Sequence, residues 1–117
     1  MQGSFLRFYV HQDQRHHHEL VWEWLLMRAN KLGIRGGSAF RAMAGFGQHH
    51  AVHEDGYFEL AGTATVEIEF MVSNAEAQQL LNLLHREKLR LFYAHIPARF
   101  VVIDRNTADP PSMTSGE

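Results

Sequence analysis

Two groups of residues in this chain could do chemistry. One is a Gly-Phe-Gly motif, the glycine triplet, and the other is a set of histidines. In the triplet, Gly45 and Gly47 flank Phe46, and Gln48 follows directly. Because glycine has no Cβ and adopts positive φ, backbone amides beside it can approach a phosphate closely. A glycine pair at a strand end is more often a simple bend, so the triplet indicates a phosphate site only if its surroundings agree.

The chain has nine histidines, and six of them fall in two clusters. His49, His50 and His53 follow the triplet and suggest a metal site, because neutral imidazole is the commonest metal ligand. No further ligand type stands at a diagnostic spacing, so we expect a polar loop that touches a partner or solvent instead. The other cluster, residues 16–18, precedes a helical segment and either caps it or lies in solvent; a site there is the minor alternative.

The residue patterns that catalysis requires are not recognisable. No G-x-S-x-G elbow, P-loop or H-E-x-x-H motif occurs. The chain has no cysteine, which removes thiol nucleophiles and thiolate metal sites. Glu67 and Glu69 are close in sequence, but they alternate with apolar residues as the outward groups of a strand do. We therefore expect a protein that is not an enzyme.

The composition narrows the partner classes. The chain has 117 residues, of which 45% are hydrophobic and 21% charged, as is ordinary for one globular domain. A net charge of −2 argues against nucleic-acid binding, because a phosphate footprint needs clustered Lys and Arg. No segment approaches the ~18 apolar residues of a membrane span, and no signal peptide is recognisable. We expect a cytoplasmic protein with no nucleic-acid partner and no direct membrane insertion.

Hydrophobic periodicity predicts the elements that position these groups. Alternating apolar residues predict strands, and an apolar period of 3.6 residues predicts helices. Strands are expected at residues 4–10, 38–44 and 64–72 and within 91–103, and helices at about 19–32 and directly after Ser73. Two local signals support the helix ends: Ser73 and Glu76 have capping-box spacing, and Gly33 stands where a left-handed C-cap is expected.

The order β-α-β-β-α-β predicts an α+β ferredoxin-like sandwich, a four-stranded antiparallel sheet with two helices on one face. In that topology the second and fourth strands are the edges. Pro97 in the last strand agrees, because proline lacks the N–H donor that an internal strand needs. Residues 1–105 are expected to form one domain, and the polar tail 106–117 to be disordered.

The element order and the triplet together resemble the PII signal-transduction superfamily and, within it, the PII-like family called domain of unknown function 190. The shared motifs are a glycine-containing turn after the first helix, a strand ending in an arginine and the triplet, and a nearby histidine. The matching residues are Gly33, Gly36, Gly37, Arg41, Gly45, Phe46, Gly47 and His53. The chain departs from true PII proteins after the second helix, where basic "HREKLRLF" replaces a glycine-rich loop.

The resemblance implies a PII-like homotrimer whose intersubunit clefts hold an adenine nucleotide, AMP, ADP or ATP. The expected ligand residues are Arg41, Gly45, Phe46, Gly47 and Gln48, joined by Arg99. Arg99 qualifies because its planar guanidinium suits phosphate, although a surface salt bridge is the alternative. The loop 48–62 is expected to contact a partner protein such as a membrane transporter or channel. Two open sheet edges and the outward residues Tyr9, Met71 and Val101 also favour a closed assembly.

Two other functions stay open. A metal-binding or metal-tolerance trimer could use His49, His50 and His53, since a copper-tolerance family shares this trimeric fold. A trimer that binds no ligand and acts as an adaptor is the second alternative.

Overall fold

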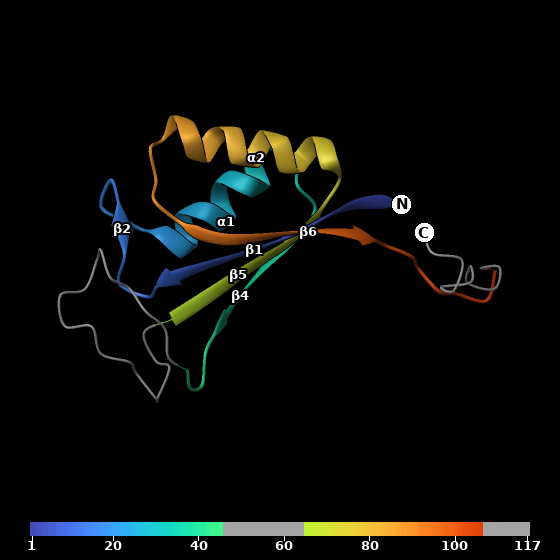
Figure 1. Cartoon of the computed structure of the whole chain (residues 1–117), viewed down its shortest axis with the longest axis horizontal. Helices are drawn as coiled ribbons and strands as arrows, with labels where there is room; N and C mark the ends of the chain where they lie inside the picture. Colours follow the sequence, from blue (N-terminus) through green and yellow to red (C-terminus); the bar gives the residue numbers. More distant parts are fainter. Residues whose placement is uncertain (46–64, 107–117) are drawn as a thin grey trace.

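A computed structural model describes residues 1–45 and 65–106. The elements are β1 (Gln2–His11), β2 (Arg15–His16), β3 (Glu19–Leu20), α1 (Val21–Lys31), β4 (Gly37–Arg41), β5 (Thr65–Val72), α2 (Asn74–Arg86) and β6 (Phe92–Arg99). Both helices lie on one face of a four-stranded sheet (Figure 1). The predicted α+β sandwich is therefore confirmed, with the short hairpin β2–β3 as an addition.

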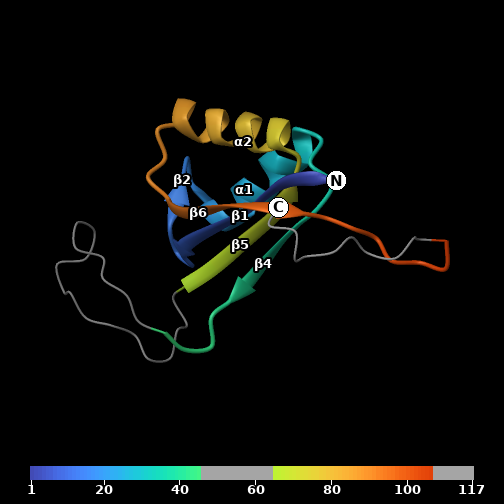
Figure 2. The ribbon, with the colours of Figure 1, turned by 45° about the vertical axis from the view of Figure 1, so that its right-hand side comes forward.

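The sheet has the order β4-β5-β1-β6, and every neighbouring pair is antiparallel. The second and fourth strands of the predicted order, β4 and β6, are thus the two edges; Figure 2 shows β4 beside β5 at one of them. Pro97 pairs with Ser4 on edge strand β6, where its missing N–H is tolerated. The strand positions were predicted well: β6 lies within the predicted range 91–103, but β4 ends at Arg41 instead of residue 44.

The core lies between the sheet and the helices, because every second residue of the two central strands faces that layer. The buried residues of β1 and β5 are Leu6, Phe8, Val10, Val66, Ile68, Phe70 and Val72. The helices contribute Val21, Trp24, Leu25, Ala29, Ala77, Leu80, Leu83 and Leu84. This alternation fixes the register, since a slip by one residue would turn the apolar set of a strand away from the helices.

Both predicted helix-end signals are confirmed. The Ser73 hydroxyl accepts a hydrogen bond from the Glu76 amide at 3.1 Å, and the Glu76 carboxylate accepts one from the Ser73 amide at 2.9 Å. After α1, Gly33 has φ +91°, a conformation that glycine adopts at little cost. The helix α1 begins at Val21, two residues later than predicted, because Glu19 and Leu20 pair in the hairpin instead.

The hairpin β2–β3 contains the histidine cluster at residues 16–18. His17 and His18 form its two-residue turn, with φ +53° and +72°. The expectation that the cluster caps the helix or lies in solvent is wrong for His16. The N-cap of α1 is Leu20, which makes no side-chain cap hydrogen bond, and the His16 side chain is only 13% exposed.

The other face of the sheet carries no helix and combines a charged centre with apolar surroundings (Figure 1). At its centre Arg7 forms ion pairs with Glu67 at 3.0 Å and Glu69 at 3.3 Å. Exposed large apolar side chains lie at positions that pair across this face: Phe40, Met71, Phe92 and Ile96. Tyr9 and Met71 lie on this face as predicted, whereas Val101 lies beyond the end of β6.

Two further predictions concern segments that the structure leaves out. The loop 48–62 lies outside the described residues, as does the tail 106–117 apart from Asn106. Of the helices in the described part of the chain, neither has the length and apolar character to cross a membrane.

Candidate functional site

A pocket of about 450 Å³ opens at the end of the sheet where β4 ends. The turn after β1, the start of α1 and the ends of β3, β4 and β5 all contribute to its walls. Its lining residues are Gln12, Asp13, Leu20, Trp22, Ala39, Phe40, Arg41 and Val66. One of the predicted ligand residues, Arg41, therefore lies in a pocket, at the base of the connection that carries the glycine triplet.

The wall formed by the turn after β1 is held by local hydrogen bonds. The Gln14 amide donates to the His11 carbonyl at 3.0 Å, and the Asp13 amide donates to His11 Nδ1 at 3.1 Å. The Val21 amide donates to the Gln14 carbonyl at 2.8 Å and so joins the turn to the start of α1. These contacts fix Asp13 and Trp22 relative to the end of the sheet.

The pocket residues offer three kinds of contact. Within residues 1–45 and 65–106 Arg41 forms no ion pair, and a guanidinium is a group that suits an anion. Asp13 supplies a carboxylate that accepts hydrogen bonds, and the half-buried Trp22 supplies a flat apolar surface. A planar ligand with hydrogen-bond donors and an anionic end, as in a nucleotide, matches this combination.

The predicted ligand residue Arg99 lies far from this pocket within one chain. It ends β6 and pairs with Gln2 at the start of β1, whereas Arg41 pairs with Val66 and through it with Val10 near the end of β1. The two arginines thus lie at opposite ends and on opposite edges of the sheet. Within a single chain, one ligand therefore cannot contact both arginines.

Of the other predicted ligand residues in the triplet and the loop, the structure describes Gly45. Gly45 is exposed, and a Cβ added to it would meet nothing within 4 Å. The predicted residues outside the described ranges are Phe46, Gly47, Gln48, His49, His50 and His53. Arg86 ends α2, and the basic residues Lys88 and Arg90 follow it; all three are exposed.

Sequence reasoning singled out none of Gln12, Asp13 and Trp22 as ligand residues. Asp13 and Gln12 stand in a short polar turn with no motif around them. The available signal was their position directly after β1. The chain must turn there to reach the start of α1, and this turn lies at the same end of the sheet as the end of the second predicted strand. Trp22 precedes the buried Trp24 by two residues, a spacing that turns it away from the core.

The fold is the PII-like version of the ferredoxin-like sandwich. The structure is similar to a crystal structure from Thermus thermophilus, described as a "putative PII-like signaling protein", with a TM-score of 0.52 and 16% identity. The match covers 84% of this chain and 90% of that one. Residues 3–106 match the family DUF190, described as "Uncharacterized ACR", and the chain belongs to this family. A curated relative, a "UPF0166 protein" of Aquifex aeolicus (strain VF5), is 26% identical over 78 residues, which are 67% of this chain and 74% of that protein. The predicted family is confirmed.

Proposed function

We propose that this protein is a trimeric PII-like signalling protein that binds an adenine nucleotide between copies of the chain. The observation that carries the proposal is the pocket at Arg41. It places an arginine with no ion-pair partner among the described residues beside Asp13 and Trp22. Phosphate on the guanidinium and the base against the indole would use both kinds of contact.

The helix-free face of the sheet supports assembly with further copies. Exposed apolar side chains on that face, Phe40 at 50%, Met71 at 63% and Phe92 at 74%, are costly to leave in water. Closed rotational symmetry would cover them and also the two sheet edges. In such a ring, Arg99 of one copy can approach the Arg41 pocket of its neighbour, which it cannot do within a chain.

Signalling would proceed through the segment 48–62. The connection to this segment begins next to the pocket, since β4 ends at Arg41, which lines it. A nucleotide held at that base would favour some conformations of the segment over others and so change its affinity for a partner protein such as a membrane transporter or channel.

Calorimetric titration of AMP, ADP and ATP into the full chain at fixed salt tests the proposal. Arg41→Ala and Arg99→Ala should each weaken binding by about ten- to hundredfold, because a charge-assisted hydrogen bond is worth ~1.5–3 kcal/mol. Arg35→Ala is the matched control, since Arg35 is exposed and lies outside the Arg41 pocket. Light scattering should give about three times the chain mass of 13.5 kDa for all four proteins.

The alternatives predict different results. If none of the three nucleotides binds more tightly than about millimolar, near −4 kcal/mol, the nucleotide proposal is wrong. A trimer that binds none of them favours the adaptor function. Metal-dependent stabilisation that disappears when His49, His50 and His53 are replaced favours the metal-tolerance function.

A further inference from the structure

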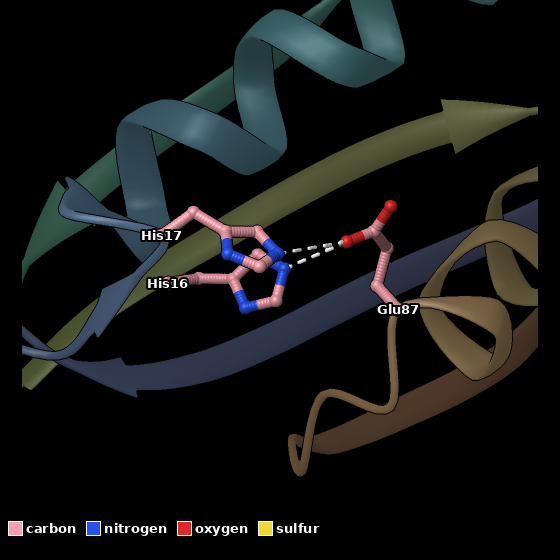
Figure 3. Close-up of side chains that lie close together, drawn as sticks. All are labelled: His16, His17 and Glu87. Atoms are coloured by element: carbon pink, nitrogen blue, oxygen red, sulfur yellow. Dashed lines mark hydrogen bonds and ion pairs between the residues drawn. The ribbon is translucent and has the colours of Figure 1, made fainter.

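A second group of side chains converges at the hairpin β2–β3, outside the pocket. His16 ends β2, His17 begins the turn, and Glu87 follows the last residue of α2. His16 Nε2 lies 2.8 Å from Glu87 Oε1, and His17 Nε2 lies 3.7 Å from the same oxygen. Figure 3 shows both imidazole rings presenting a nitrogen to one carboxylate, which comes from the residue directly after α2. All three ligand atoms lie within 4.8 Å of one another.

These distances fit a tetrahedral metal centre. Zinc binds imidazole nitrogen at ~2.0–2.1 Å and carboxylate oxygen at ~2.0–2.2 Å, so tetrahedral ligand atoms stand ~3.3–3.5 Å apart. The observed separations of 2.8 and 3.7 Å fall on either side of that value. The two histidine nitrogens also lie within 4.8 Å of one another. His17 is 76% exposed, so solvent can reach the group and supply the fourth ligand.

The surrounding residues hold two of the three ligands in place. The His16 ring packs edge-on against Trp24, with ring centroids 4.9 Å apart, and Trp24 is buried in the core. Arg28 lies over the same indole at 5.3 Å, and its Nη1 is 3.9 Å from Glu87 Oε2. Arg28 therefore contacts the carboxylate oxygen that the histidines do not face. Such outer contacts orient ligands in metal sites.

The backbone at the turn points to a ligand role for His17. Both turn residues have positive φ, +53° at His17 and +72° at His18. Two-residue turns of this kind prefer Asn-Gly, because side chains with a bulky Cβ are disfavoured there. A strained residue of this kind persists where the surrounding structure requires it, and functional sites are where such residues gather. At this turn, the strained backbone brings a second imidazole to Glu87.

We infer that His16, His17 and Glu87 form a binding site for a divalent transition-metal ion of the Zn²⁺ class. Two neutral imidazoles and one carboxylate are ligands that Zn²⁺ takes, and the chain has no cysteine that would favour a softer ion. Bound metal would tie the hairpin to the end of α2, two segments 71 residues apart in sequence. The site uses none of the residues that line the pocket at Arg41 and none of the histidines at 49, 50 and 53.

Calorimetric titration of ZnCl₂ into the metal-free full chain tests the inference, with thermal unfolding as a second measurement. The informative variant is His17→Asn, because asparagine tolerates positive φ and keeps the turn folded while removing the imidazole. His18→Asn is the matched control: the same change at the neighbouring turn position, which lies outside the cluster. Glu87→Gln keeps the shape of the third ligand and removes its charge.

One Zn²⁺ per chain should bind the parent and raise its unfolding temperature. His17→Asn and Glu87→Gln should each weaken binding at least tenfold, since even changes to outer-shell partners cost ~10–100-fold in metal affinity. His18→Asn should bind as the parent does. Replacing His49, His50 and His53 together should leave this binding intact.

Three results would overturn the inference. The first is a parent that binds no Zn²⁺, which would leave the His16–Glu87 hydrogen bond as a purely structural link. The second is an equal loss in His17→Asn and His18→Asn. The third is binding that survives in His17→Asn but disappears when the loop histidines are replaced, which would place the metal on the loop.

Discussion

The histidine turn is expected to cost the protein stability, and relieving it should make the protein more stable. A residue with a Cβ in the left-handed region costs roughly 1–2 kcal/mol, and His17 and His18 both lie there, at φ +53° and +72°. Replacing them with Asn and Gly, respectively, gives the sequence that this turn prefers. The perturbation is the double variant His17→Asn/His18→Gly.

The expected gain is about 1 kcal/mol. Full relief at both positions is worth ~2–4 kcal/mol at most, and asparagine relieves only part of the cost at position 17. Glycine gives back ~0.5–1 kcal/mol, because it gains more freedom than other residues in the unfolded chain. Losing His17 costs little, since its ring is 76% exposed and 3.7 Å from Glu87. A gain of this size raises the unfolding temperature of a domain of this length by about 3–6 °C.

Urea unfolding with a chelator present measures this gain without any contribution from metal. Tryptophan fluorescence is a suitable probe, because Trp24 contacts His16 directly. The control His17→Ala/His18→Ala keeps the positive-φ cost and should show no gain. A double Asn-Gly variant that is less stable than the parent would refute the reasoning, since the turn would then not be strained.

Two further predictions concern packing and charge. Gly37→Ala should destabilise the fold by ~1–3 kcal/mol in urea unfolding, because the new Cβ would lie 2.5 Å from Cε1 of the buried Phe70 ring. Gly36→Ala, where nothing lies within 4 Å, should change stability by less than about 0.5 kcal/mol or raise it slightly; equal losses at both glycines would contradict this. The hydrogen bond from His16 holds the pKa of Glu87 below its usual 4.5, helped by the charges of His16, Arg28 and His17 and opposed by partial desolvation. A carboxyl whose pKa is lowered by folding stabilises the native state above its unfolded pKa and loses that effect as the pH falls through the folded value. The advantage of the parent over Glu87→Gln in metal-free urea unfolding should therefore be present above pH 4.5 and shrink below it; an advantage that grows on acidification would be contrary to this sign.

The sequence predicted the features that depend on neighbouring residues. The alternation of Val66, Ile68, Phe70 and Val72 predicted both β5 and its buried face, because successive side chains of a strand point to opposite faces of the sheet. The capping box at Ser73 was equally predictable, since both of its hydrogen bonds span only three residues. The family followed from the order of these elements together with the glycine triplet.

The features that the sequence did not reveal depend on distant contacts. The hairpin β2–β3 was missed because two histidines are a poor signal for a tight turn, which normally needs Asn or Gly. The partnership of His16 with Glu87 joins the hairpin to the end of α2, 71 residues away in sequence, and no local pattern records it. The separation of Arg41 from Arg99 was equally hidden, since it depends on strand order and register.

The placement of Arg41 and Arg99 at opposite corners of the sheet links ligand occupancy to the concentration of the protein itself. In the proposed assembly each nucleotide site exists only while two copies are in contact, so dilution below the association range removes the site as well as the trimer. The linkage also runs in reverse. A ligand that binds the assembled form but not the free chain stabilises the assembly by RT ln(1 + [L]/Kd) per site, about 2.7 kcal/mol at a hundredfold excess over Kd. Nucleotide binding would then stabilise the assembled ring. Cells with a low concentration of this chain would need more nucleotide to obtain the same signal.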